Sequence, residues 1–157
     1  MQLDRTDCEI IRALQKNGRL SNKELAARVG LAASTCLVRL RRLVHGGALR
    51  GFRAIVDPQS LGIGLQAVVA IQLRQHSKEQ VEAFREHALR LEEVISLYHM
   101  SGAKDFLIHV AVRDTDHLKE LAMTAFTTRP EVERIETSLI FEHVAAHEMP
   151  IYADVED

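Results

Sequence analysis

Residues 33–45 read ASTCLVRLRRLVH, and this stretch decides the fold. Its apolar residues Cys36, Leu40 and Leu43 recur at the spacing of one face of an α-helix. The other positions carry two hydroxyl side chains and three guanidinium groups: Ser34, Thr35, Arg39, Arg41 and Arg42. Because such side chains bind base edges and phosphate, the stretch is typical of a helix in the major groove of DNA. An ordinary surface helix with solvated arginines has the same composition.

The residues just before this stretch predict a second helix and a tight turn. Ser21 and Glu24 form an S-x-x-E capping box, so a helix should begin there. Gly30 follows the apolar side of that helix and suits a terminal residue with positive φ. Two short helices joined by a glycine-containing turn form the helix-turn-helix pattern. The sequence therefore predicts binding to double-stranded DNA.

The charge distribution agrees with this interpretation, although the net charge of the 157-residue chain is only −2. Residues 1–56 carry 11 Lys and Arg against 4 Asp and Glu, and the remaining residues carry 9 against 18, out of totals of 20 and 22. A basic first third joined to an acidic remainder indicates a DNA-binding module attached to a part that faces away from DNA.

Residues 1–48 are predicted to form the helix-turn-helix domain, and residues 49–64 a linker strand and hinge. Asp4 and Asp7 supply the N-cap and the acidic partner of a first helix. The sequence LRGFRAIV at 49–56 reads as a short strand before an Asp-Pro turn. This basic strand is consistent with a wing near the DNA backbone, although a plain linker strand also fits.

Residues 65–145 show the pattern of a βαββαβ domain. Strands are predicted at 65–73, 94–101, 105–112 and 132–144. Ser77, and Asp114 or Thr115, cap the two helices between them. The predicted fold class is α+β: a winged helix-turn-helix joined by a linker strand to a ferredoxin-like domain for effector sensing and oligomerisation. Residues 146–157 form a tail that closes over a neighbouring subunit or frays.

Two helices on one side of a four-stranded sheet leave the other face open. That face is expected to carry Val69, Ile71 or their neighbours. A half-apolar open face usually packs against a partner sheet, so the sequence predicts a homodimer with two sheets back to back.

Nothing in the sequence predicts a membrane or secreted protein. No apolar run approaches the ~20 residues that a membrane span needs, and residues 1–7 lack the apolar segment of a signal peptide. We therefore expect a cytoplasmic location and no membrane partner. Cys8 and Cys36 are expected to be reduced core thiols, with a redox role for Cys36 left open.

Four stretches together resemble the Lrp/AsnC regulators, the feast/famine proteins of bacteria and archaea. They are LDRTDCEIIRALQKNGR at 3–19, LAARVGLAASTCLVRLRRL at 25–43, GFRAIVDP at 51–58 and SGAKDFL at 101–107. The resemblance implies a nucleoid-associated transcription factor that responds to an amino acid or a related metabolite. It further implies a homodimer that assembles to a tetramer or octamer, without enzymatic activity and without a cofactor or metal.

By this resemblance the effector binds where sensing domains of neighbouring dimers meet, against the turn at 102–105. Gly102 and Asp105 match the family's G-x-x-D pattern: glycine lets the backbone approach a ligand, and a carboxylate pairs with an α-ammonium group. A hairpin turn with Asp105 as a strand-end cap fits the same residues. The effector candidates are Gly102, Lys104, Asp105, Thr137 and Ser138.

The predicted base contacts are Ser34, Thr35 and Arg39, and the predicted phosphate contacts are Arg41, Arg42 and Arg53. Val38 also belongs to this DNA-binding set, because it stands where the family commonly has a polar or basic residue and so indicates an unusual base preference. Ala32 and Ala33 replace the Ser and Pro that usually cap this helix, and losing such a cap typically costs ~1 kcal/mol.

Two other functions fit parts of the sequence. Siroheme-decarboxylase-like enzymes share this fold and use histidines around a large cavity, and the chain carries His99, His109 and His143 on or near the predicted strands. No spacing typical of a metal site, a catalytic triad or a phosphate-binding loop supports catalysis. A DNA-architectural protein without an effector is the other alternative. The basic helix favours the regulator over the enzyme.

Overall fold

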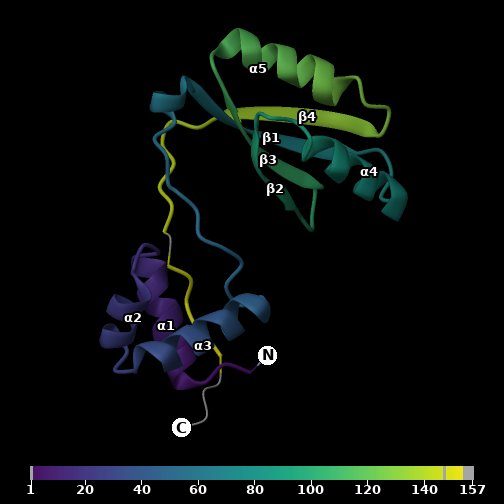
Figure 1. Ribbon diagram of the computed structural model, residues 1–157. Helices are drawn as coiled ribbons and strands as arrows, with labels where there is room; N and C mark the ends of the chain where they lie inside the picture. The colour runs from purple at the N-terminus through teal and green to yellow at the C-terminus, as the bar shows by residue number, and fades with distance from the viewer. Residues whose placement is uncertain (1, 147, 154–157) are drawn as a thin grey trace. The chain divides into compact units, whose positions relative to one another are not determined.

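Figure 1 shows the computed structural model, which describes residues 2–146 and 148–153. The chain divides into two units: one combines the residues up to Ile55 with those from Val144 onward, and the other spans Val56–His143. The elements are α1 (Arg5–Lys16), α2 (Asn22–Arg28), α3 (Ala33–His45), the 3-10 turn η1 (Gln59–Leu61), β1 (Leu65–Leu73), α4 (Lys78–Ala88), β2 (Val94–His99), β3 (Phe106–Val112), α5 (Thr115–Leu121), the π-helical turn η2 (Ala122–Thr127) and β4 (Val132–Leu139).

The three N-terminal helices begin where the sequence predicts. Both predicted capping boxes form, Asp4 with Asp7 at α1 and Ser21 with Glu24 at α2. Gly30 adopts a φ of 68° in the turn before α3, a conformation that favours glycine. Apolar side chains from all three helices make one core: Ile10, Ala13, Leu14, Leu25, Ala26, Cys36 and Leu43. Both predicted helix-turn-helix helices are therefore anchored on α1.

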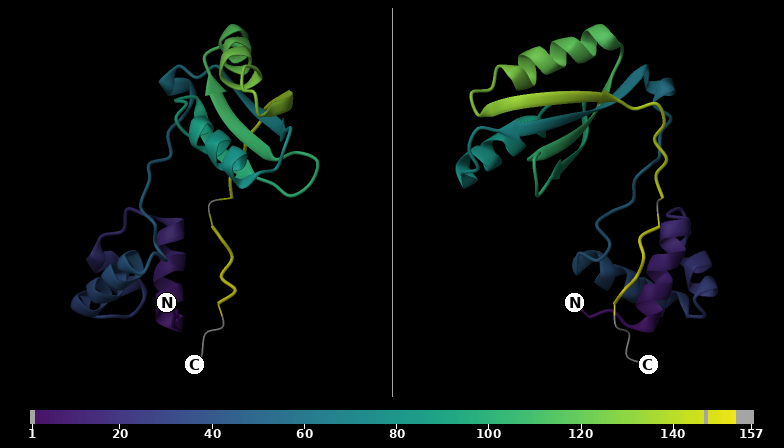
Figure 2. Two further views of the ribbon diagram at one scale, coloured as in Figure 1. Left: turned by 90° about the vertical axis from the view of Figure 1, so that its right-hand side faces the viewer. Right: turned by 180° about the vertical axis from the view of Figure 1, so that it is seen from behind.

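The segment after Val144 belongs to this first unit. The side-chain amide of Gln15 on α1 donates to the backbone oxygen of Met149 at 3.2 Å and accepts from its backbone nitrogen at 2.5 Å. Figure 2 shows the segment running beside α1. The chain therefore passes between the two units twice, once through the linker and once through this C-terminal segment.

The predicted linker strand is wrong for the isolated chain. Residues 50–57 are extended but pair with no other described segment, and Phe52 and Ile55 are exposed. A strand exists only where a neighbour satisfies its N–H and C=O groups, and the described part of the chain offers none here. Within residues 2–146 and 148–153 of the isolated chain, the helix-turn-helix therefore has no paired strand that forms a wing.

The second unit is the predicted βαββαβ domain. Its four strands are antiparallel in the order β2-β3-β1-β4. Both helices pack on one face of this sheet, where Phe84, Phe106 and Phe126 lie in a single core. Asp114 proves to be the N-cap of α5, and Ser77 that of α4.

The structure decides which residues the open face of the sheet carries and corrects the bounds of three strands. Val69 and Ile71 are fully buried under the helices, so the open face carries their neighbours Val68 and Ala70. The last strand ends at Leu139 rather than at Val144, because β1, with which it pairs in the described part of the chain, begins at Leu65. The second strand likewise ends early, at His99, and the third begins at Phe106.

Candidate functional site

One side of α3 is available to a partner. Ser34, Val38, Arg41 and His45 follow one another at intervals of four, three and four residues, so they lie along one line on the helix surface. All four are exposed, and Thr35 lies beside the start of this line. Cys36 and Leu43 occupy the opposite, fully buried side. Among the described residues, Arg41 has no ion-pair partner on its own chain.

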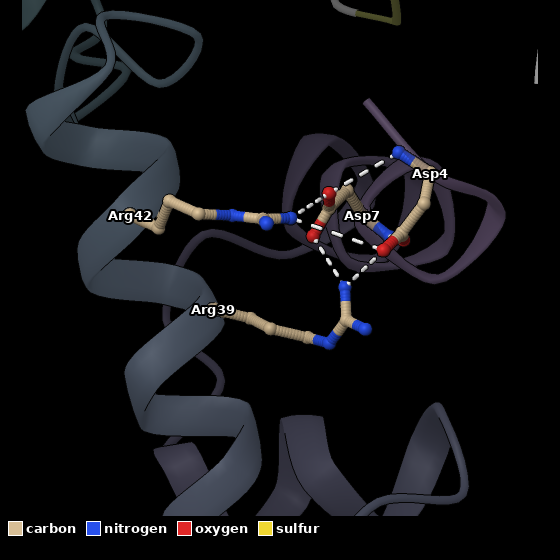
Figure 3. Close-up of polar contacts among 4 residues, drawn as sticks. All are labelled: Asp4, Asp7, Arg39 and Arg42. Carbon is tan, nitrogen blue, oxygen red and sulfur yellow. Dashed lines mark hydrogen bonds and ion pairs between the residues drawn. The ribbon is translucent and has the colours of Figure 1, made fainter. Parts of the chain in front are cut away.

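The other two arginines of α3 point toward α1, as Figure 3 shows. Arg39 Nη1 lies 2.6 Å from Asp4 Oδ2 and 2.9 Å from Asp7 Oδ1. Arg42 Nη2 bonds Asp7 Oδ2 and lies 3.8 Å from Asp4 Oδ2. We call these four residues the Asp–Arg clamp. The acidic pair that caps α1 therefore also fixes α3.

The charges of the clamp stabilise one another. The hydrogen bond from Arg39, with a further one from the Asp7 backbone, holds the pKa of Asp4 below its ordinary value. The same contacts with Asp4 and Asp7 raise the pKa of Arg39. Asp7 is 0% exposed, whereas the side chains of Arg39 and Arg42 are 27% and 50% exposed. The buried carboxylate is thus neutralised by two partly exposed guanidinium groups.

This arrangement changes the roles predicted for Arg39 and Arg42. The sequence assigned Arg39 to a base edge and Arg42 to phosphate, yet both guanidinium groups bind α1. Arg39 lies one helical turn after Cys36 and one before Leu43, at the margin of the apolar face, so its position was a signal that its side chain can reach α1. The structure leaves Ser34, Thr35, Val38 and Arg41 on the exposed side of α3, with Arg53 exposed in the linker.

The turn between β2 and β3 is built around Asp105. Its Oδ2 accepts a hydrogen bond from the backbone nitrogen of Leu73 at 2.7 Å, and its Oδ1 lies 2.7 Å from His76 Nδ1. The side chain is only 7% exposed. Asp105 therefore ties the turn to the end of β1, which is the strand-end role that the sequence left open. Gly102 has a φ of 125°, so a glycine is required there.

Lys104 in the same turn reaches across to the last strand. Its Nζ lies 2.6 Å from Glu136 Oε1, and Arg134 Nε lies 3.1 Å from the same oxygen. The hydrogen bond from Lys104 is the main reason why the pKa of Glu136 lies below its ordinary value.

The structure does not bring all the effector candidates to one surface. Thr137 pairs with Val69, whose side chain faces the helices, and Ser138 pairs with Val68 on the open face. Consecutive strand residues point to opposite sides, so these two cannot line the same side of the sheet. Gly102, Lys104 and Asp105 do lie in one turn.

Three histidines of the enzymatic alternative, His99, His109 and His143, contact neighbouring side chains. His109 bonds Gln66 Oε1 at 2.8 Å, and burial, followed by the nearby His143, lowers its pKa. His99 stacks on Phe106 with ring centroids 4.9 Å apart. In the described ranges, no three His, Cys, Asp or Glu side chains gather in a way that could hold a metal ion.

The two thiols are free and buried, as predicted for Cys8 and Cys36. Burial raises the pKa of the Cys36 thiol, which disfavours the reactive thiolate. Across residues 2–146 and 148–153, no helix has both the length and the apolarity to cross a membrane.

Comparisons with known proteins point to the same two parts. Residues 3–44 match the AsnC-type helix-turn-helix domain, and residues 66–150 match the Lrp/AsnC ligand binding domain. The chain is 38% identical over 142 residues to the HTH-type transcriptional regulator AldR of Mycolicibacterium smegmatis, covering 90% of this chain and 83% of that protein. It is 35% identical over 142 residues to the leucine-responsive regulatory protein of Escherichia coli, covering 90% and 87%.

Solved structures give the same result. A transcriptional regulator from Neisseria meningitidis in complex with L-Met superposes with a TM-score of 0.84 at 30% identity, covering 92% of this chain and 93% of that one. Escherichia coli AsnC superposes with a TM-score of 0.80 at 25% identity, covering 98% and 100%.

Proposed function

Because this chain belongs to the Lrp/AsnC family of DNA-binding transcriptional regulators, we propose that it reads a specific DNA sequence through α3 and changes its assembly when an amino acid binds. The exposed line on α3 carries the DNA-reading part of this proposal. Ser34, Thr35 and Val38 face base edges, and Arg41 and Arg53 contact phosphate or guanine. Arg39 and Arg42 position α3 through the Asp–Arg clamp.

Arg41→Ala tests the interface. The variant is expected to bind all DNA sequences more weakly, because one cationic contact is lost, and to reduce the slope of log affinity against log salt by about 1 per α3 engaged. Fluorescence anisotropy with a labelled duplex over a range of KCl concentrations measures both quantities. Lys119→Ala removes one exposed charge from α5 and is the matched control. An Arg41→Ala protein with an unaltered salt slope contradicts the assignment.

The open face of the sheet supports a homodimer. Val68, Ala70 and Leu107 lie half-buried on this face, and Tyr98 beside them is 58% exposed. An antiparallel sheet with an apolar open face gains stability by covering that face, and a second copy supplies a surface of the same shape. We propose that two sheets pack back to back and that dimers assemble further.

The ligand-binding domain supports an amino-acid effector. The similar structure from Neisseria meningitidis contains L-Met. In this chain Gly102 allows close approach of the backbone, and the Lys104 ammonium is a suitable partner for a ligand carboxylate. We assign Asp105 to holding the turn in place, because its side chain is 7% exposed, accepts the Leu73 N–H and lies 2.7 Å from His76 Nδ1.

The assembly is tested by light scattering of the full chain, repeated with each amino acid. We expect a dimer or a multiple of it, and a shift in mass with at least one amino acid. Val68→Glu places a charge in the centre of the open face and is expected to give monomers with an unchanged circular dichroism spectrum. Met123→Glu, at an exposed apolar position in η2, is the control. A monomeric wild type contradicts the dimer, and a dimeric Val68→Glu protein contradicts the back-to-back packing of the sheets. A mass that no amino acid shifts contradicts the effector.

A further inference from the structure

Val38 is an apolar side chain in the middle of the proposed DNA-reading line. It is 66% exposed and is not among the side chains packed on the N-terminal core. Ser34 precedes it by one helical turn and Arg41 follows it by nearly one, so its surroundings are polar and cationic. Valine is also a weaker helix former than lysine, arginine or glutamate, so helix stability does not account for it.

The Asp–Arg clamp sets the direction in which Val38 points. Arg39 and Arg42 reach from α3 to Asp4 and Asp7 on α1, which opposes rotation of α3 about its own axis. With the core residues Cys36 and Leu43 on the same inner side, Val38 is held facing outward. Val38 therefore contacts any partner that binds the exposed line on α3.

The chemistry of the line restricts that partner. A basic unit with an exposed guanidinium beside Val38 matches a polyanion and not an apolar protein surface. Within the major groove of DNA the apolar feature is the C5-methyl group of thymine. We propose, on the basis of the proposed function above, that Val38 reads the methyl group of one thymine in each half-site and so selects an A·T pair at that position.

The spacing on α3 places this thymine relative to its neighbours. Ser34 and Val38 are separated by four residues, about 6 Å along the helix axis. This is close to two steps of about 3.4 Å along one DNA strand. The thymine is therefore expected about two base pairs from the base that Ser34 contacts. Arg41 is expected to contact the DNA on the opposite side of this thymine from Ser34.

The test removes only the methyl group. Duplexes selected from a random pool by the wild-type protein give the operator, and each thymine in turn is replaced by deoxyuridine. At one position per half-site the wild type is expected to bind about three- to fivefold more weakly, the effect of uncovering one methyl group. In Val38→Ala the same replacement changes affinity less, since both γ-methyl groups that reach the thymine are already removed. Val38→Thr, which keeps one methyl group, retains part of the effect.

The outcomes separate this inference from the proposed function. If no operator is enriched, the proposed function fails and the inference falls with it. If an operator is enriched but every thymine tolerates deoxyuridine, or if the penalty is equal in wild type and Val38→Ala, only the role of Val38 is overturned. The salt slope of Val38→Ala should equal that of the wild type because no charge is removed, and its melting temperature should be the same or slightly higher because alanine is the better helix former.

Discussion

Asp7→Ala is expected to destabilise the N-terminal unit by about 2–4 kcal/mol and to abolish specific DNA binding. The substitution removes a fully buried carboxylate that bonds both Arg39 and Arg42 and that completes the capping box of α1. The loss of stability is smaller than for a wholly buried ion pair, because water can solvate the two partly exposed arginines once Asp7 is gone. Without the Asp–Arg clamp, α3 is also freer to rotate about its own axis, so its exposed side chains are no longer held in position for DNA.

Hydrogen exchange of the backbone amides in residues 33–45, together with DNA affinity, measures both effects of Asp7→Ala. Glu9→Ala is the matched control, because Glu9 is on the same helix and its ion pair with Arg5 is largely exposed. Such a surface pair contributes about 0.5 kcal/mol. Equal protection of α3 in the two variants would contradict the role of the clamp.

Asp105→Ala is expected to destabilise the C-terminal unit by about 2–3 kcal/mol, beyond any effect on an effector. The backbone N–H of Leu73 loses its buried acceptor, and His76 Nδ1 loses the carboxylate oxygen that lies 2.7 Å away. Thermal unfolding of the full chain, followed by calorimetry, should show the loss in the transition of this unit. Asp105→Asn keeps an acceptor for Leu73 and is expected to lose less.

Lys104→Met separates ligand binding from stability at the same turn. Lys104 is in a surface ion pair with Glu136, so its removal should change the melting temperature little while weakening the response to an amino acid. A stable Asp105→Ala protein that has lost only its response would show instead that Asp105 contacts the ligand.

Local sequence patterns predicted the elements well because their causes are local. The capping boxes, Gly30 and the apolar spacing of α3 are each contained within a few residues, and α3 begins and ends where the spacing predicts. Strand β1 likewise spans the predicted residues, because its buried and half-buried side chains alternate.

The errors concern partners that are distant in sequence. Arg39 and Arg42 bind carboxylates that lie 32 to 35 residues earlier. No local rule indicates that the carboxylates of Asp4 and Asp7, which cap α1, also accept hydrogen bonds from α3. The segment at 49–56 has the composition of a strand, but pairing depends on a neighbour that the described chain lacks. For Asp105 the sequence left a ligand contact and a strand-end role open, and the distant contacts with Leu73 and His76 support the strand-end role.

The contact between Gln15 and Met149 has a consequence for biosynthesis. The two residues are 134 positions apart, so a ribosome adding about 5–20 residues per second emits Gln15 on the order of ten seconds before its backbone partner. During that interval the three helices can bury their core, while the side-chain amide of Gln15 stays hydrogen-bonded to water. The DNA-binding unit is therefore the first part of this protein to begin folding and among the last to be completed. Translation that stops before Val144 yields the three helices without the C-terminal segment that belongs to their unit.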